Sequence, residues 1–303
     1  MKLFTRRDFF SCGVQAGAGL AMLARAAASP AGRVCKMKFG FTSYQWGSEW
    51  DIPTMIANLT RAKAFSTELR TSAKYAHGVE LTLNAEQRRE VKKQFADSPI
   101  LLVGLAIVER LDSPDPARLN QQIESAKAYV IESAKAYVKL SQDVGGHGIR
   151  VVPNDFHPEV PHEKTIEQIS RALNALGKFA AGYGQRIRLE NHGTAGDLVT
   201  LRKVMEGVDQ RNVGIKLNGE MVDAADFAQR FEGVKKYLDD TLHFHELGRG
   251  DFPYQLQCDL LIDEGWEGWW QLEASSQVPD RLQATIAQRE LWEAMVAKSL
   301  ARP

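Results

Sequence analysis

Short β-rich runs alternate with longer amphipathic stretches from about residue 36 to the end of the chain. Each short run is rich in β-branched, aromatic or leucine residues and is bounded by Gly, Pro, Asn or Asp, as buried strands are. The eight predicted strands are 38–46, 66–71, 100–107, 148–153, 186–192, 213–218, 241–247 and 268–274. The stretches between them space apolar residues three and four positions apart, which predicts helices over 52–64, 85–95, 116–142, 163–183, 195–207, 223–237, 254–264 and 279–300.

This alternation predicts a parallel sheet, because strands joined by crossover helices run parallel with right-handed connections. Eight such units in a chain of this length close most economically into a (β/α)8 TIM barrel, an α/β fold. The alternative is an open doubly wound sheet, which is weakened because no G-x-G-x-x-G turn follows the first predicted strand. No Pro- or Ser-rich linker divides the chain, so we expect a single barrel domain over 37–303.

The third predicted helix carries a tandem repeat. Residues 123–130 read IESAKAYV, and residues 131–138 repeat them letter for letter. Eight residues advance a helix face by about 80° beyond two full turns, so the two copies cannot present the same stripe to the barrel. We therefore expect a recent or engineered duplication. It predicts a helix about two turns longer than its neighbours, or one copy extruded as a loop, far from the catalytic chemistry.

The first 28 residues have the features of an export signal. TRRDFF at 5–10 resembles the twin-arginine motif, and a weakly apolar run over 12–23 and small residues at 26–28 follow it. The apolar run is too short for a membrane span of about 20 residues, so we expect no stable membrane anchor. The sequence thus predicts a twin-arginine signal peptide over 1–28, a linker over 29–36, the twin-arginine translocation machinery as a partner, and a periplasmic location.

Composition and charge narrow the classes of function. The 303 residues are 44% hydrophobic and 25% charged, which fits a soluble globular protein. The 38 basic and 38 acidic residues balance, and loss of residues 1–28 leaves a formal charge of −3, which argues against a nucleic-acid partner. Three cysteines rule out a disulfide scaffold, although one disulfide between Cys35 and Cys258 is compatible with the sequence. The classes of function that remain are an enzyme and a binding protein. The composition does not determine the oligomeric state, and a homo-oligomer is possible.

Four consecutive predicted strands end in side chains with oxygen or imidazole donor atoms. The C-terminal ends of the strands are where a barrel has its active site. The fifth strand ends in Glu190, Asn191 and His192, the sixth in Asn218 and the eighth in Glu273, and the seventh carries His243 and His245. Side chains alternate along a strand, so the two histidines of the seventh strand share a face. Carboxylate, amide and imidazole donors suit Mn²⁺, Mg²⁺, Co²⁺ or Zn²⁺, so the sequence predicts one divalent metal ion here.

The same residues carry a family resemblance. L-E-N-H at 189–192, Asn218, H-F-H-E at 243–246 and L-E at 272–273 resemble the xylose isomerase-like TIM-barrel superfamily of sugar and sugar-phosphate isomerases and epimerases. E-L-R-T at 68–71, H-G-V-E at 77–80 and G-D-F-P-Y at 250–254 belong to the same likeness. The resemblance covers about residues 37–300 and looks closest to exported sugar phosphate isomerase/epimerase proteins.

The resemblance implies a metal held by Glu190, Asn218, a histidine of the seventh strand and Glu273. Asn218 stands where the family usually has aspartate, which removes one negative charge and should weaken metal affinity. Alignment of H-F-H-E with the common H-V-K-D favours His243 as the ligand. Alignment with the ketose epimerases favours His245, to which we give a slight preference while keeping both.

The resemblance also implies the reaction. In the epimerases of this family the metal binds adjacent sugar oxygens, polarises a carbonyl and stabilises the enediolate that forms when a neighbouring C–H loses its proton. Glu190 and Glu273 would be the catalytic carboxylates that remove and return the proton. The expected function is a metal-dependent sugar isomerase or epimerase with a small carbohydrate substrate, and the sequence does not distinguish the two reactions.

Further side chains at or near strand ends are candidates for binding substrate. Six could bind hydroxyls or a phosphate, and an indole after the first strand could stack on a sugar face. These residues are Glu68, Arg70, His77, Arg150, His192 and Lys216, together with Trp46. No glycine-rich, phosphate-binding helix start is obvious and sugar phosphates are scarce outside the cytoplasm, which favours an unphosphorylated sugar or glycoside.

Three other functions share the fold or the chemistry. A metal-dependent lyase or hydratase acting on keto-sugars or keto-glycosides would use the same proton abstraction and then expel a leaving group. A non-catalytic sugar-binding barrel is the second alternative, which Asn218 keeps open. An endonuclease IV-like phosphodiesterase would need several more His and Asp ligands, which the second and third strands lack.

Overall fold

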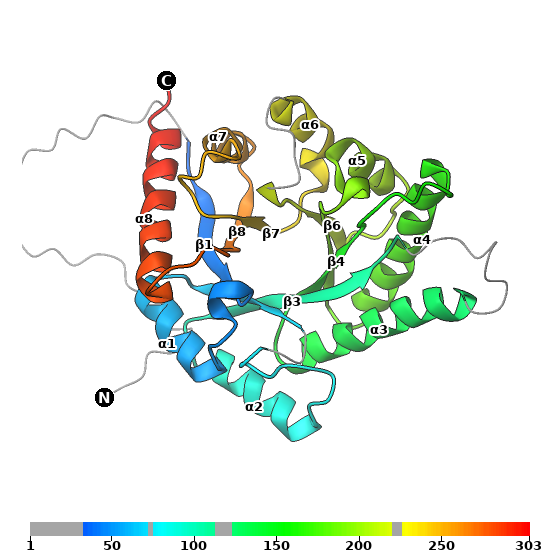
Figure 1. Cartoon of the computed structure of the whole chain (residues 1–303), viewed down its shortest axis with the longest axis horizontal. Helices are drawn as coiled ribbons and strands as arrows, with labels where there is room; N and C mark the ends of the chain where they lie inside the picture. The colour runs from blue at the N-terminus through cyan, green and yellow to red at the C-terminus, as the bar shows by residue number, and fades with distance from the viewer. Residues whose placement is uncertain (1–32, 72–74, 113–122, 220–225) are drawn as a thin grey trace, which may run out of the picture.

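A computed structural model describes residues 33–71, 75–112, 123–219 and 226–303 of the chain. Eight parallel strands stand at its centre with helices around them (Figure 1). The strands are β1 (Lys36–Thr42), β2 (Ser66–Arg70), β3 (Leu101–Arg110), β4 (Gly148–Val152), β5 (Arg186–Glu190), β6 (Val213–Lys216), β7 (Thr241–Phe244) and β8 (Glu267–Leu272). Each lies within or overlaps a run that the hydrophobic pattern predicts.

The strands are ordered as a barrel. The sheet runs β6-β5-β4-β3-β2-β1-β8-β7, so β1 and β8, the two ends of the barrel sequence, are neighbours. Their register extends from Lys36↔Glu267 to Phe41↔Leu272. Parallel bridges at Ile215↔Leu238 and Asn218↔His243 connect β6 to the region of β7. The protein is therefore a nearly closed (β/α)8 TIM barrel in a single domain, as the alternation of elements predicts.

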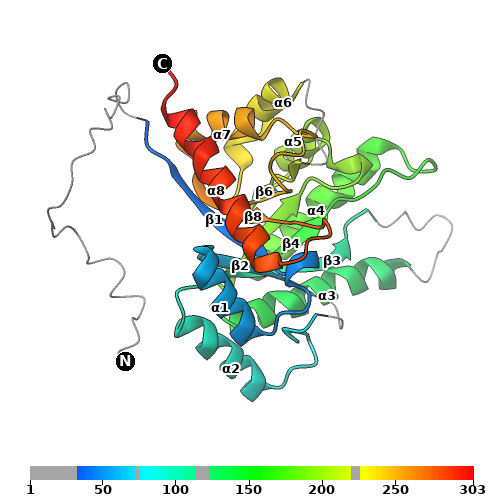
Figure 2. The ribbon, with the colours of Figure 1, turned by 60° about the vertical axis from the view of Figure 1, so that its left-hand side comes forward.

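In the described part of the chain, eight α-helices form the outer layer. They are α1 (Ile52–Ala62), α2 (Ala85–Ala96), α3 (Ile123–Asp143), α4 (His162–Ala181), α5 (Leu198–Glu206), α6 (Phe227–Val234), α7 (Tyr254–Asp263) and α8 (Arg281–Leu300). Short 3-10 turns, η2 (Gln45–Gly47), η4 (Thr194–Gly196) and η6 (Lys235–Tyr237), join some of them to strands. The last helix lies beside the first, as Figure 2 shows, so the outer ring closes with the barrel. Asn84 and Gln87 form a capping box that starts α2.

Several sequence expectations lie partly outside the described residues. The predicted signal peptide over 1–28 and residues 29–32 of the linker lie there, as do residues 116–122 and 223–225 of two predicted helices. Both octapeptide copies lie within α3, so neither is extruded as a loop. With 21 residues, α3 is longer than α2, which has 12, but only one residue longer than α4, which has 20, so the expectation of two extra turns over both neighbours is wrong. Cys35 and Cys258 are free thiols, so the disulfide that the sequence allowed is not formed. No described helix is long and apolar enough to span a membrane.

The hydrophobic core lies between the barrel and the helices. Outward-facing residues of neighbouring strands stack there, with Phe39, Phe244 and Trp270 buried against one another. Phe39 also contacts Trp292 of α8, with ring centroids 5.8 Å apart. Trp46, in the turn after β1, is also buried, because its Nε1 donates to the Ser276 carbonyl and only 3% of its surface is exposed. Little of the Trp46 ring is exposed, and its stacking on a sugar stays a prediction.

The inside of the barrel, by contrast, is polar and charged. Arg188 of β5 is fully buried there, with its Nε 2.9 Å from Asp240 Oδ1 and its Nη1 donating to the Val103 carbonyl. Two glycines make room for its guanidinium, since a Cβ at either Gly104 or Gly148 would lie 2.9 Å from Arg188 Nη1. Small residues at these inward positions thus allow an arginine to occupy the barrel interior.

Gly148→Ala tests this packing. The added Cβ would lie 2.5 Å from the Arg186 carbonyl oxygen, so the strand must shift, and we expect the free energy of unfolding to fall by about 1 to 3 kcal/mol. Gly233→Ala in α6 is the matched control, because its nearest contact is the flexible Arg202 Cδ at 3.4 Å. Urea unfolding of both variants measures the effect, and equal stabilities would contradict the packing account.

Candidate functional site

Six inward-facing side chains form a buried charged cluster near the C-terminal ends of the strands. Alternate residues of a strand face opposite sides, and these six come from β2, β4, β5, β6 and the ends of β7 and β8. We call them the central network: Glu68, Arg150, Glu190, Lys216, His243 and Glu273, all of them buried. A buried charge requires a partner, so the contacts among these residues determine which of them can bind or transfer a proton.

The His243 imidazole joins carboxylates from three strands. Its Nε2 lies 2.7 Å from Glu68 Oε2, and its Nδ1 lies 3.0 Å from Glu190 Oε2 and 3.1 Å from Glu273 Oε2. Burial and the Lys216 charge both lower the pKa of His243, but the three carboxylates outweigh them and raise it to about 10. With these protein groups alone as neighbours, His243 is an imidazolium at neutral pH.

Glu68 and Lys216 support His243 from the side opposite the other two carboxylates. Lys216 Nζ lies 2.7 Å from Glu68 Oε1, and both side chains are fully buried. Burial raises the pKa of Glu68, but Lys216 and His243 overcome this effect and hold it well below its usual range. Burial also lowers the pKa of Lys216. The sequence made both residues candidates for substrate binding, whereas the structure places them behind His243 as a fixed ion pair.

Arg150 of β4 fixes the carboxylate of Glu190. Its Nε lies 3.0 Å from Glu190 Oε2, and its Nη1 donates to the Ile107 carbonyl at 3.0 Å. Burial raises the pKa of Glu190, but Arg150 and then His243 hold it well below its usual range. The pKa of Glu273 is also lowered, because His243 outweighs the effect of burial. Both carboxylates are thus ionised at neutral pH.

Asn218 and His245 lie just beyond the ends of β6 and β7. Asn218 Nδ2 lies 3.1 Å from Glu190 Oε1 and 3.4 Å from Glu273 Oε2. Asn218 Oδ1 lies 2.9 Å from His245 Nε2, while His245 Nδ1 lies 2.9 Å from the Glu273 carbonyl oxygen. Both histidines of the H-F-H-E motif therefore lie close to the carboxylates of Glu190 and Glu273. His243 contacts the carboxylate oxygens themselves, and His245 contacts Asn218.

The remaining predicted substrate-binding residues occupy different depths. Arg70 ends β2 and is partly exposed, and the exposed His192 follows β5 with its Nδ1 3.0 Å from Asn154 Oδ1. His77 is only 6% exposed, its Nε2 donates to the Arg70 carbonyl, and its Nδ1 accepts from the Val79 N–H. Both ring nitrogens of His77 are therefore used to hold the end of β2.

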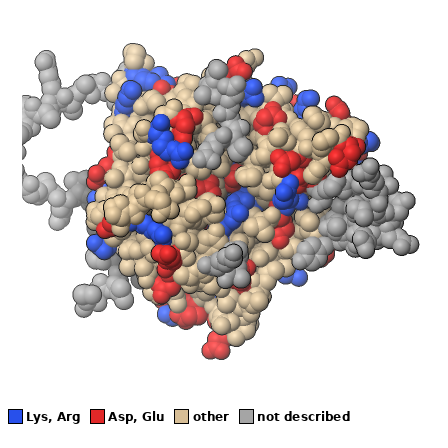
Figure 3. All heavy atoms as spheres, in the orientation of Figure 1, with Lys and Arg blue, Asp and Glu red and all other residues tan. Residues whose placement is uncertain are grey.

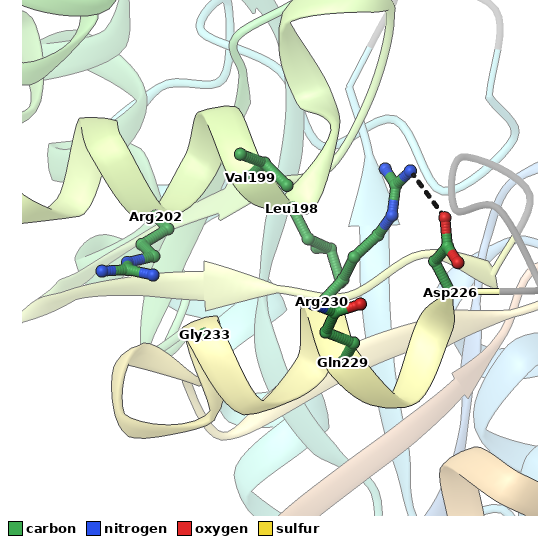
Figure 4. Close-up of a pocket in the computed structure, with 7 residues that line it drawn as sticks. All are labelled: Leu198, Val199, Arg202, Asp226, Gln229, Arg230 and Gly233. Carbon is green, nitrogen blue, oxygen red and sulfur yellow. Dashed lines mark hydrogen bonds and ion pairs between the residues drawn. The ribbon is translucent and has the colours of Figure 1, made fainter.

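A surface pocket between α5 and α6 lies apart from this chemistry. Figure 4 shows its lining, in which Arg230 and Asp226 form an ion pair at 3.5 Å. The lining residues are Leu198, Val199, Arg202, Asp226, Gln229, Arg230 and Gly233. None of them belongs to the central network or faces the barrel interior, so this pocket is not the candidate active site.

The donor atoms of the central network fit a divalent cation. Glu190, His243 and Glu273 each offer a ligand atom within a common small volume. Among the described residues, His243 Nδ1 and Glu190 Oε2 have no hydrogen bond of good geometry, although they lie 3.0 Å apart. A hydrogen bond from Nε2 to Glu68 leaves Nδ1 as the ligand atom, as in the carboxylate–histidine–metal arrangement of many metal sites. Carboxylate and imidazole donors accept several divalent metals, so the ion's identity is not fixed.

The sequence analysis named Glu68, Arg70 and Glu190 as single strand-end candidates, but it missed Arg188 and the charged inner face that these residues share. Arg186, Arg188 and Glu190 occupy alternate positions of a strand that is otherwise apolar, and Glu68 and Arg70 do the same on β2. Charges repeated every second residue in buried strands indicate a polar barrel interior. Tyr254 belongs to the G-D-F-P-Y segment of the resemblance, but nothing in the sequence indicates that its hydroxyl accepts from the His245 N–H at 2.8 Å.

Comparison with known proteins agrees with this fold. The family model described as xylose isomerase-like TIM barrel matches residues 66–218, about half of the chain. The chain belongs to the xylose isomerase-like TIM-barrel family. The matched segment runs from β2 to Asn218 and so contains four of the six residues of the central network. No curated protein matches this xylose isomerase-like chain.

Solved structures with the same fold include several sugar epimerases. The 3-keto-D-glucoside 4-epimerase YcjR from E. coli superposes with a TM-score of 0.66 at 16% identity, covering 86% of this chain and 100% of that one. D-psicose 3-epimerase from Clostridium cellulolyticum H10, solved with D-tagatose, has a TM-score of 0.69 at 17% identity and covers 86% and 99%. IOLI, solved with a bound zinc atom, has a TM-score of 0.70 at 15% identity and covers 87% and 99%. At these identities, the similarity shows a shared fold.

The pKa of His77 makes stability depend on pH. Burial lowers its pKa from 6.5 to about 4 in the folded state, so an unfolded chain binds this proton first as the pH falls. The contribution of neutral His77 to the free energy of unfolding is fully present above about pH 6.5 and is lost as the pH falls toward 4. By about pH 4.5 the loss is about 2 to 3 kcal/mol. Urea unfolding of wild type and His77→Asn at pH 7 and about pH 4.5 measures this loss. Equal pH dependence in the two proteins would contradict it.

Proposed function

We propose that this protein is a divalent-metal-assisted sugar isomerase or epimerase that moves a proton on a carbon next to a carbonyl. The observation that carries the proposal is the pair of ionised carboxylates, Glu190 and Glu273, held by one imidazole at the C-terminal end of a barrel. Two carboxylates on different strands can serve as the base that removes a proton and the acid that returns it. The sugar epimerases that share the fold support a carbohydrate as the substrate.

Glu190, Glu273 and His243 would hold the metal, with Asn218 and His245 beside them. When bound, a divalent cation supplies electrophilic polarisation of a carbonyl, which acidifies the neighbouring C–H. The zinc atom in IOLI supports a metal in this family's barrel. Glu68 holds the His243 ring in one orientation through its 2.7 Å contact with Nε2, so the ligand face of the ring always points at the two carboxylates.

The two carboxylates differ in access. The Glu190 side chain is 2% exposed and is fixed by Arg150, whereas the Glu273 side chain keeps 11% of its surface accessible. Glu273 is therefore the carboxylate that a substrate entering from the mouth reaches first. Glu190 approaches from β5, so proton return from that residue would reach the substrate from a different direction. Return to the opposite face gives epimerisation, and return to the next carbon gives isomerisation.

Solvent deuterium exchange tests the proposal. The purified protein, supplied with Mn²⁺, Co²⁺ or Zn²⁺, is incubated in D₂O with a panel of ketoses, aldoses and 3-keto-glycosides, and deuterium next to the carbonyl is followed by NMR. Wild type should exchange the proton, and Glu190→Gln and Glu273→Gln should each slow exchange by about 100-fold or more, since each loses a group that carries the proton.

Glu206→Gln on α5 is the matched control, because that exposed carboxylate pairs only with Arg202 on its own helix among the described contacts. It should exchange at the wild-type rate. Normal exchange in Glu190→Gln or Glu273→Gln would reject that residue as an essential base. Release of a leaving group in place of exchange would instead identify a lyase.

A further inference from the structure

Arg70 is the last residue of β2 and lies one inward-facing position beyond Glu68 of the central network, toward the C-terminal end of the barrel. It follows Ser66 and Glu68 on the inward face of that strand. Its backbone is held on both sides, since its N–H donates to Ser43 Oγ at 2.8 Å and its carbonyl accepts from His77 Nε2 at 3.0 Å. The direction in which the side chain leaves the strand is therefore fixed by the fold.

The Arg70 guanidinium has no ion-pair partner among the described residues. Its neighbours in the network differ in this respect, because Arg150 pairs with Glu190 and Lys216 pairs with Glu68. The contact that the structure gives Arg70 is with the Tyr44 ring, whose centroid lies 5.4 Å from the guanidinium carbon. A partly buried arginine that rests on an aromatic ring presents its planar donor edge to an incoming acceptor.

The other charged side chains near Arg70 are paired among themselves. Arg150 Nε lies 3.0 Å from Glu190 Oε2 and Lys216 Nζ lies 2.7 Å from Glu68 Oε1, so the cations beside Arg70 already have their carboxylates. Burial and the Arg150 charge lower the pKa of Arg70 against the smaller effects of Glu190, Tyr75 and Glu273. An added anion would therefore be stabilised at this position.

The position is also accessible. Arg70, Tyr44 and Tyr75 are all partly exposed, whereas Glu190 below them is closed off. Figure 3 shows Lys/Arg and Asp/Glu atoms side by side near the centre of one face of the molecule, inside the ring of helices. A substrate that reaches Glu273 from this side has Arg70 and the two phenol rings beside it.

We propose that Arg70, with Tyr44 and Tyr75 beside it, binds the carboxylate of an acidic keto-sugar such as a keto-uronate. The proposal rests on the proposed function for the reacting end of the molecule. A guanidinium matches a carboxylate through two parallel N–H···O bonds. One guanidinium without an ion-pair partner among the described residues matches a monoanion through one bidentate contact, whereas a phosphate monoester would bring close to two negative charges.

Matched substrates test this specificity. Solvent exchange is measured with D-fructose, with D-fructuronate, which carries a carboxylate in place of the terminal CH₂OH, and with D-fructose 6-phosphate. We expect wild type to prefer the uronate over the neutral ketose by about tenfold or more in kcat/KM, the effect of one charge-assisted contact. Arg70→Gln should reduce that preference at least about tenfold through KM, and Arg70→Lys should restore part of it.

Arg171→Gln on α4 removes the same charge at an exposed site and should retain the preference. A preference for the neutral ketose, or equal losses with both substrates in Arg70→Gln, would overturn the proposal. A preference for the phosphate would assign the arginine to a different anion and would overturn it as well.

A binding measurement separates this proposal from the reaction. Isothermal titration with D-glucuronate and D-glucose, neither of which needs to react, should show binding of the uronate that Arg70→Gln weakens by about tenfold. If no compound exchanges its proton but this binding difference is present, the proposed reaction fails and the carboxylate site stands. If exchange occurs and glucuronate binds no better than glucose, the carboxylate site fails alone.

Discussion

The pairing of buried charges inside the barrel is the constraint on which this structure depends. Taking a carboxylate or a guanidinium out of water costs several kcal/mol, and the cost is offset only when partners and hydrogen bonds surround the charge. Arg188 with Asp240 forms one such pair, and Lys216, Glu68 and His243 form a continuous chain. Loss of one member would leave its partner as an unpaired buried ion, a change that commonly costs about 3 to 5 kcal/mol.

The same pairing creates the chemistry at the strand ends. Glu68 and Lys216 keep His243 in one orientation, and Arg150 and His243 keep Glu190 ionised in spite of burial. The polar barrel interior is thus both a structural support and the inner part of the site. Arg70 is the one arginine of this region without a carboxylate partner among the described residues, which is why a ligand is expected to complete its pairing.

Much of the fold could be predicted because local patterns specify it. Strand runs and amphipathic helices are visible as periods in the sequence, and their alternation allows few topologies. The strand-end residues Glu190, Asn218 and Glu273 could be found for the same reason, since strand ends in a barrel converge. The pairing of His243 with Glu68 joins positions 175 residues apart, so it depends on register and barrel closure rather than on local pattern. The burial of Trp46 could not be predicted, because a position in a loop does not reveal how much of a side chain is exposed.

The central claim is that the carboxylates and imidazole at the strand ends form one divalent-metal site. Metal analysis of the purified full-length protein after reconstitution with Mn²⁺, Co²⁺ or Zn²⁺ and exhaustive dialysis tests this most directly. The account predicts about one equivalent per chain, lost when both Glu190 and Glu273 are replaced by Gln, since deprotonated ligands carry the affinity. Less than about one tenth of an equivalent in the wild-type protein would contradict it.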